Sequence, residues 1–227
     1  MNTPITASQE RAAKTSNGMV MLLISLASMV GGAALAITMA PLGIGAAIMG
    51  VVIGLFLLCG LYSIQPNEAV AILLFGDYRG TDRNAGLRWV LPWYSRKKVS
   101  MRVRNVTSDK LKVNDKRGNP IEIAANVVWR VRDSAQALFD VDDYAAFVNI
   151  QIDTALRDIT SAYAYDHAED HEPSLRADAE LVAEKLREEL NERVRVAGVT
   201  IDEARLAHLA YASEIAGAML RRQQAEA

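Results

Sequence analysis

The hydrophobic and polar positions divide the chain into two parts with different patterns. Residues 15–67 contain no Asp, Glu, Lys or Arg, whereas charged residues are spread along most of the remainder. A charge near the centre of a bilayer costs about 2.5–3.5 kcal/mol on insertion scales, so such an uncharged run is what a membrane segment requires. As one helix it would be roughly 80 Å long, whereas a hydrocarbon core is about 30 Å thick. We therefore predict that the run folds back on itself.

The turn is expected at Pro41 and Gly43, because proline disfavours helix at the residue before it and glycine permits a tight turn. This predicts a transmembrane hairpin over residues 19–61, with helices at 19–39 and 44–61, after a polar tail at 1–18. A buried core helix and a cleaved signal peptide are the alternatives. Two consecutive spans argue against the first, and the length of the apolar stretch argues against the second.

Small residues are regularly spaced in both predicted spans. Gly50 and Gly54 form a GxxxG pattern that Ala46 extends, and Ala27 and Gly31 share the same spacing. In lipid, helices associate through close backbone approach at small residues. Ala46, Gly50 and Gly54 are therefore a candidate packing face, either within the hairpin or against a neighbouring chain.

The pattern after residue 62 predicts an α+β fold. Apolar runs and period-two alternation predict strands over residues 69–75, 98–105, 110–113 and 121–131, with a hairpin turn at 115–120. The spacing then becomes helical over 134–139, 142–160 and 174–196, and alternates again over 199–206. In the helix at 142–160, Asp142 and Asp143 stand at the N-terminal end. Its predicted apolar stripe contains Phe147, Ile150, Ala155, Leu156 and Ile159.

These elements predict a strand-rich first subdomain at 62–132 and a helical second subdomain at 133–209. Ser213 resembles the N-cap of a last helix within 210–227. That helix has no C-cap, turn or glycine at its end, so we expect it to be the start of a longer assembly helix.

Charge is distributed unevenly along the soluble part. Residues 79–132 carry 14 Lys or Arg against 4 Asp or Glu, and residues 133–227 carry 9 against 20. A basic face on anionic headgroups gains about 1 kcal/mol per well-placed cation. The candidate membrane-surface residues are Arg96, Lys97, Lys98, Arg102 and Arg104. A solvated strand face is one alternative, and contact between the basic half of one subunit and the acidic half of the next is another.

The basic residues before the first span predict the orientation. Arg11 and Lys14 place that end in the cytoplasm by the positive-inside rule, and two spans return the following domain to the same side. A single crossing would place the domain outside. We expect an integral protein of a bacterial plasma membrane with a cytoplasmic domain.

The sequence offers little that predicts catalysis. His167 and His171 have a spacing that can hold a metal, but their polar segment precedes Pro173 and favours a solvated loop. His208 is expected to be a packed or surface histidine. Cys59 is the one cysteine, so no disulfide can form within the chain. GxSxG, P-loop and GxGxxG motifs are missing, so no catalytic residue, cofactor or metal is expected.

A nucleic-acid partner is not expected either, because the chain is near neutral and lacks a reading motif.

Several blocks together resemble the SPFH (band 7) domain of stomatins, prohibitins and flotillins. The blocks are SIQPNEAV from Ser63, FGDY from Phe75, GLRWVLPW from Gly86, KVND from Lys112, GNPIEI from Gly118, VVWRV from Val127, FDVDDY from Phe139, ALR from Ala155 and LAYASEIAGAM from Leu209. They occur in order over about residues 62–227.

The resemblance implies a non-enzymatic scaffold. Similar proteins form membrane-attached rings or cages through long helices that follow the domain, and they enclose or regulate proteases, channels and lipid microdomains. The implied partners are further copies of the chain, membrane lipids, and a membrane protease or channel. The alternative function is a regulatory binding subunit of such a protease or channel, without a ring of its own.

Overall fold

A computed structural model describes residues 7–38, 42–166, 173–215 and 217, which form two compact units. The N-terminal unit is Gln9–Arg102, and the C-terminal unit is Val103–Ala227 together with Met1–Ser8. The predicted division between residues 132 and 133 does not coincide with this one. The strand that ends at Val131 pairs along its length with the last strand of the chain, so both belong to one sheet.

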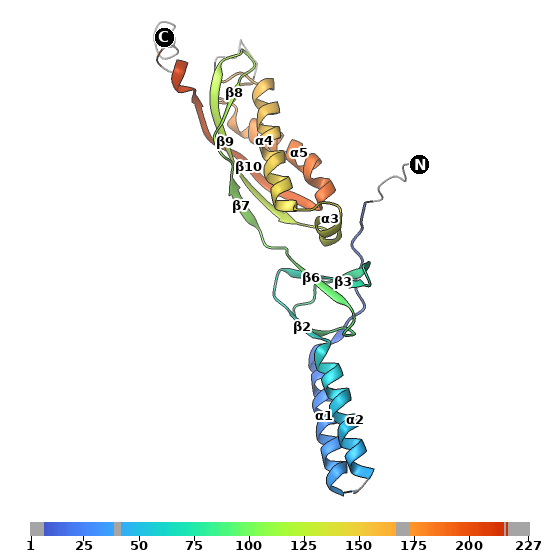
Figure 1. The fold of residues 1–227 in the computed structure, drawn as a ribbon. Helices are drawn as coiled ribbons and strands as arrows, with labels where there is room; N and C mark the ends of the chain where they lie inside the picture. Colours follow the sequence, from blue (N-terminus) through green and yellow to red (C-terminus); the bar gives the residue numbers. More distant parts are fainter. Residues whose placement is uncertain (1–6, 39–41, 167–172, 216, 218–227) are drawn as a thin grey trace, which may run out of the picture. The chain divides into compact units, whose positions relative to one another are not determined.

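The N-terminal unit begins with a pair of apolar helices. These are α1 (Gly18–Thr38) and α2 (Leu42–Cys59), which lie side by side (Figure 1). They run antiparallel, because Gly32 lies against Ala46 near the start of α2 whereas Ser25 bonds to Gly54 near its end. The turn predicted at Pro41 lies outside the described residues. The second helix ends two residues before the predicted residue 61, because the chain enters a strand at Leu61.

Two small sheets complete this unit. One has the order β1 (Ser16–Asn17), β5 (Gly86–Trp89), β2 (Leu61–Ile64), and the other has the order β4 (Asp77–Asp82), β3 (Glu68–Leu74), β6 (Ser95–Ser100). Their common core is formed by Tyr62, Ile64, Val70, Ile72 and Val90. Because β1 precedes α1 and β2 follows α2, the two outer ends of the helical pair are joined to one sheet.

The C-terminal unit is a sheet covered by helices. The central strand is β9 (Pro120–Val131). It pairs with β10 (Val199–Tyr211) on one side, and with β7 (Arg104–Thr107) and β8 (Leu111–Asn114) on the other. The helices are α3 (Ser134–Phe139), α4 (Tyr144–Ala162) and α5 (Ala179–Val194), followed by a 3₁₀ turn at Arg195–Ala197. Figure 1 shows α4 and α5 on one face of the sheet, and their buried side chains include Ile152, Leu156, Leu186 and Leu190.

The predicted strand at 98–105 is two strands with different partners. β6 pairs with β3, β7 pairs with β9, and residues 101–103 between them contain the division of the two units. The alternation continues through the break because each strand has one inward face. An alternating pattern predicts a strand, but it does not identify the neighbouring strand with which that strand pairs.

The second helix of this unit differs from its predicted stripe. Ala155, Leu156 and Ile159 are buried as expected, but Ile150 is 62% exposed, and Val148 and Ile152 lie in the core instead. α4 begins at Tyr144 with Asp143 as its N-cap, and Val148 and Ile152 share its buried face with Ala155, Leu156 and Ile159. The inward face is therefore shifted relative to the one expected from the sequence.

The last strand is longer than predicted. β10 continues through Ala210 and Tyr211 instead of ending at residue 206. The bulges between Ile201 and Glu203 and between Leu206 and His208 allow this strand to remain paired with β9. Residues 213–215 are helical, and most of the expected assembly helix lies outside the described residues.

Candidate functional site

The outward-facing side chains of α1 and α2 are mainly apolar. Ile37 is 86% exposed, Val30 68% and Ile44 61%. α1 is long and apolar enough to cross a membrane, and Gly43–Cys59 of α2 is a shorter apolar helix of the same character. Large contiguous apolar surface of this kind is rare on soluble proteins and marks contact with lipid or with another protein.

Small residues bring the two helices into close contact. A Cβ at Gly50 would meet the carbonyl oxygen of Ser28, and one at Gly54 would meet the side chain of Met29. The Ser25 hydroxyl donates to the Gly54 carbonyl at 2.9 Å, and the Ser28 hydroxyl donates to the Gly50 carbonyl at 3.3 Å. The candidate packing residues Gly50 and Gly54 thus face α1 within the chain.

The small residues of α1 divide between two faces. The Ala46 carbonyl oxygen lies 2.9 Å from where a Cβ on Gly32 would be, so Gly32 is the glycine of α1 at the helix contact. A Cβ on Gly31 would meet nothing within 4 Å, and Ala27 is also exposed. Ala27 and Gly31 therefore lie outside the contact between the two helices.

The C-terminal end of α2 is capped by side chains from the following strands. The Trp89 indole N–H donates to the Leu57 carbonyl at 2.7 Å, and the Arg96 guanidinium donates to the carbonyls of Cys59 and Leu61, both at 3.1 Å. The last carbonyls of a helix lack partners within the helix, and a cation there interacts favourably with the helix dipole. Arg96 also lies over the Tyr62 ring, 5.3 Å from its centroid. Arg96, one of the predicted membrane-surface residues, is thus bonded to the end of α2.

The other predicted basic residues of the N-terminal unit lie on β6 or just after it. Lys98 donates to the Ser63 carbonyl at 2.9 Å, and Arg102 donates to the Gln65 side chain at 2.9 Å. Lys97 is exposed on the same strand as Arg96 and Lys98.

Arg104 belongs to the C-terminal unit and has aromatic partners there. It donates to the Tyr144 hydroxyl at 3.0 Å and lies 5.0 Å from the centroid of the Trp129 ring. Arg104 therefore belongs to a different unit from the other four predicted basic residues.

Sequence reasoning missed aromatic residues beside the end of α2. The Trp93 ring is 5.8 Å from the Phe56 ring in α2, and Trp93 is 51% exposed. Trp89 caps the same helix, as described above. Tryptophan is enriched where a membrane meets water, so the pair Trp89 and Trp93, four residues apart, was a signal available in the sequence.

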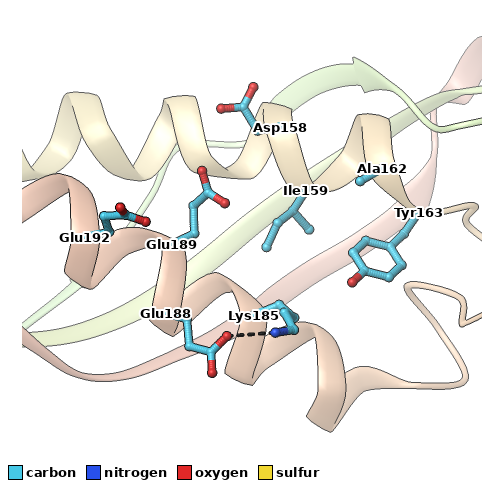
Figure 2. A pocket seen from close by; sticks show the side chains of 8 residues that line it. All are labelled: Asp158, Ile159, Ala162, Tyr163, Lys185, Glu188, Glu189 and Glu192. Carbon is cyan, nitrogen blue, oxygen red and sulfur yellow. Dashed lines mark hydrogen bonds and ion pairs between the residues drawn. The ribbon is translucent and has the colours of Figure 1, made fainter.

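A shallow depression in the C-terminal unit lies between α4 and α5 and is lined mainly by charged side chains (Figure 2). The Lys185 amine donates to Glu188 at 2.8 Å, and Arg193 pairs with both Asp158 and Glu189 at 2.6 Å. The residues that line it are Asp158, Ile159, Ala162, Tyr163, Lys185, Glu188, Glu189 and Glu192. They include no Ser, Cys or His, so this depression does not contain a nucleophile beside a histidine base.

His208 is the one histidine among the described residues. His167 and His171 lie outside the described residues. His208 is on β10, opposite Ala124, and its Nε2 is 3.9 Å from a Glu122 carboxylate oxygen. Among residues 7–38, 42–166, 173–215 and 217, no three His, Cys, Asp or Glu side chains are grouped as metal ligands.

The family model described as SPFH domain / Band 7 family matches residues 62–227. The chain belongs to the SPFH/band 7 family. Members of this family are generally membrane-associated, non-enzymatic scaffolds. No curated protein matches the chain.

The SPFH match begins three residues after the end of α2. Trp89 and Arg96, which cap that helix, are therefore residues of the SPFH domain itself. The segment before α1 adds β1 to the domain from outside the matched region, and Gly18 is so close that a Cβ there would lie 2.6 Å from the Leu87 carbonyl carbon. The helical pair is thus connected to the SPFH domain on both sides.

Proposed function

We propose that this SPFH protein is the membrane-anchored subunit of a non-enzymatic scaffold. In this proposal α1 and α2 cross the bilayer as a hairpin, and the SPFH domain lies on the cytoplasmic face of a bacterial plasma membrane. Copies assemble into a ring or cage that organises membrane proteins or lipid microdomains. The observation that carries the proposal is the apolar outer surface of a helical pair that is capped by residues of the SPFH domain.

The sheet at the base of the helices supports a hairpin over a single crossing. β1 comes before α1 and β2 comes after α2, and both pair with β5. Two strands of one sheet lie on one side of a membrane, so the helices between them enter and leave on that side. Arg11 and Lys14 in the segment before α1 favour the cytoplasm.

The distribution of charge supports assembly. The basic stretch at 79–132 and the acidic stretch at 133–227 would attract each other between neighbouring copies, and head-to-tail contacts of this kind generate rings. Ile150, Leu181 and Val196 add exposed apolar side chains on the C-terminal unit, at 62%, 45% and 57%.

The mass of the full-length protein, reconstituted in nanodiscs of several diameters or extracted in mild detergent, tests this proposal. We expect oligomers of defined size that weaken as salt is raised, because contacts between exposed charges are screened over about 10 Å at 0.1 M salt. A strictly monomeric protein would overturn the scaffold. Crosslinking in membranes separates the alternative, since a stoichiometric partner without self-crosslinks would favour a regulatory subunit of a membrane protease or channel.

A further inference from the structure

The turn between β3 and β4 contains a residue that its geometry does not favour. Leu74 pairs with Asp77, so Phe75 and Gly76 alone form the turn, and both have positive φ, 52° and 91°. Two-residue hairpins with positive φ at both positions strongly prefer Asn-Gly or Asp-Gly. A bulky side chain at positive φ is an outlier, so the backbone does not account for the phenylalanine.

Packing within the described residues does not account for it either. Phe75 is 90% exposed, and a Cβ on Gly76 would meet nothing within 4 Å. An exposed aromatic ring in a strained turn contributes nothing to the core of its own unit. The Phe75 ring is therefore available for contact with a partner outside the chain.

The pairing of β3 identifies what lies near this turn. β3 is antiparallel to β6, with Ile72 opposite Arg96 and Leu73 opposite Ser95. The end of β3 and the start of β6 are thus at the same edge of the sheet. Phe75 follows β3 by one residue, and Trp93 precedes β6 by two.

That edge of the sheet lies at the end of α2. The half-exposed Trp93 contacts Phe56 of α2, and Arg96 donates to the Cys59 carbonyl. Beyond the turn, Asp77 and Arg79 form an exposed ion pair at 3.3 Å. Apolar rings next to exposed charges, beside the end of an apolar helix, match the boundary between headgroups and acyl chains.

We propose that the Phe75–Gly76 turn inserts the Phe75 ring into the interface of the bilayer that α1 and α2 cross. The occupant of this surface is lipid, because the edge continues the apolar surface of α2 through Phe56 and Trp93. Phe75 and Trp93 then fix the N-terminal unit on the membrane beside its spans. This inference depends on the proposed membrane anchoring.

Single spin labels on the full-length protein test the insertion. In a Cys59→Ala background, cysteines replace Phe75, Asn67 and Val52 one at a time, and the protein is reconstituted in vesicles of phosphatidylcholine with phosphatidylglycerol. Asn67 is the matched control, since it also has positive φ, 57°, and precedes β3 at its other end. Val52, 56% exposed on α2, reports the membrane span.

We expect the label at residue 75 to collide several-fold more with oxygen, relative to a water-soluble nickel complex, than the label at 67. Equal, water-like ratios at 75 and 67 with a lipid-like ratio at 52 would overturn the insertion and leave the anchoring intact. A water-like ratio at residue 52 would overturn the anchoring and the insertion with it.

A second variant keeps the turn and removes the ring. Phe75→Asn introduces the residue that the geometry prefers, so the thermal midpoint should stay the same or rise. In vesicles we expect hydrogen exchange of the amides at 76 and 77 to become several-fold faster than in the wild type. A lower thermal midpoint would mean that Phe75 stabilises the fold itself, and unchanged exchange in vesicles would contradict insertion of the ring.

Discussion

At the scale of single residues, the contact between α1 and α2 depends on missing side chains. Gly50 is close enough to Ser28 that a Cβ would meet its carbonyl oxygen, whereas a Cβ on Gly45 of the same helix would meet nothing within 4 Å. The two glycines therefore form a matched pair for substitution, with equal changes in helix propensity and unequal changes in packing.

Gly50→Ala should destabilise the helical pair, and Gly45→Ala should not. Overpacking costs about 1–3 kcal/mol, while alanine in a helix gains up to about 1 kcal/mol over glycine. Unfolding of the detergent-solubilised protein by added sodium dodecyl sulfate, followed by circular dichroism, measures both. If the two variants unfold at the same detergent fraction, the close contact does not stabilise the pair.

Asp82 is the polar centre of the N-terminal unit. Its carboxylate, 2% exposed, accepts hydrogen bonds from Thr15 at 2.7 Å, Arg88 at 2.9 Å, Tyr62 at 3.0 Å and the backbone of Asn84 at 3.0 Å. Burial alone raises the pKa of Asp82, but these hydrogen bonds outweigh it, and the net pKa lies below its usual value. Burial first, and then the Asp82 carboxylate, raise the pKa of the Tyr62 hydroxyl.

The stability of this unit should therefore depend on acid pH. A carboxyl with a lowered folded pKa stabilises the fold above its unfolded pKa of about 3.9, and this contribution disappears as pH falls through the folded pKa. Asp82→Asn should lower the free energy of unfolding by about 3–5 kcal/mol at neutral pH and flatten its dependence below pH ~4.

Thermal unfolding between pH 3 and 7 measures this effect. Asp77→Asn is the control, because that carboxylate is 68% exposed and its removal should change stability by about 0.5 kcal/mol or less. A pH profile of Asp82→Asn parallel to that of the wild type would contradict the role of this carboxylate.

The sequence allowed packing residues to be predicted from the small size of their side chains. It did not allow hydrogen-bond partners to be predicted where they are distant in the chain. Gly50 and Gly54 were identified as packing residues because small side chains at a four-residue spacing act locally. Arg96 bonds to the carbonyls of Cys59 and Leu61, more than 30 residues away, and these partners were not predicted. Its charge is visible in the sequence, but the acceptor depends on the pairing of β6 with β3.

At the scale of elements, the starts of α3 and α4 are capped by aspartates. Asp133 accepts from the amides of Ala135 and Gln136, and Asp143 accepts from those of Ala145 and Ala146. Asp142 precedes Asp143 and is exposed. Both Asp142 and Asp143 favour the positive end of α4, but Asp143 alone is its N-cap.

Replacing the two aspartates separately should distinguish capping from charge. Asp143→Ala should lower the free energy of unfolding by roughly 1 kcal/mol, because two helix amides lose their acceptor. Asp142→Ala should lower it by a few tenths of a kcal/mol, as expected for charge near a helix end. Thermal unfolding of the two variants in one buffer compares them, and equal losses would show that charge alone matters.

Elements with local signals were predicted well, and elements defined by their neighbours were not. The helical stretch predicted to end at residue 196 is closed by Gly198 at φ 62°, and the turn at Asp115 and Gly118 joins β8 to β9. In contrast, the strand predicted over 98–105 divides between two sheets, and β10 continues five residues past its predicted end. Strand partners come from distant parts of the chain, which one sequence does not reveal.

At the scale of the whole molecule, the hairpin predicts where each end of the chain is accessible. In a Cys59→Ala background, Gln9→Cys and Ser161→Cys put single thiols at exposed positions before α1 and in α4. Both should react with a membrane-impermeant maleimide only when the cytoplasmic side is open, as in inverted vesicles. Labelling of the two thiols from opposite sides would mean a single crossing and contradict the hairpin.

The pairing of Ser16 and Asn17 with Arg88 and Trp89 also sets an order of events during synthesis. These two residues leave the ribosome before either helix, yet their partner strand is made only after both helices and β2. The first strand of the protein must therefore wait, unpaired, until residues 86–89 emerge. Its closure marks the point at which the hairpin and the strands at its base have come together.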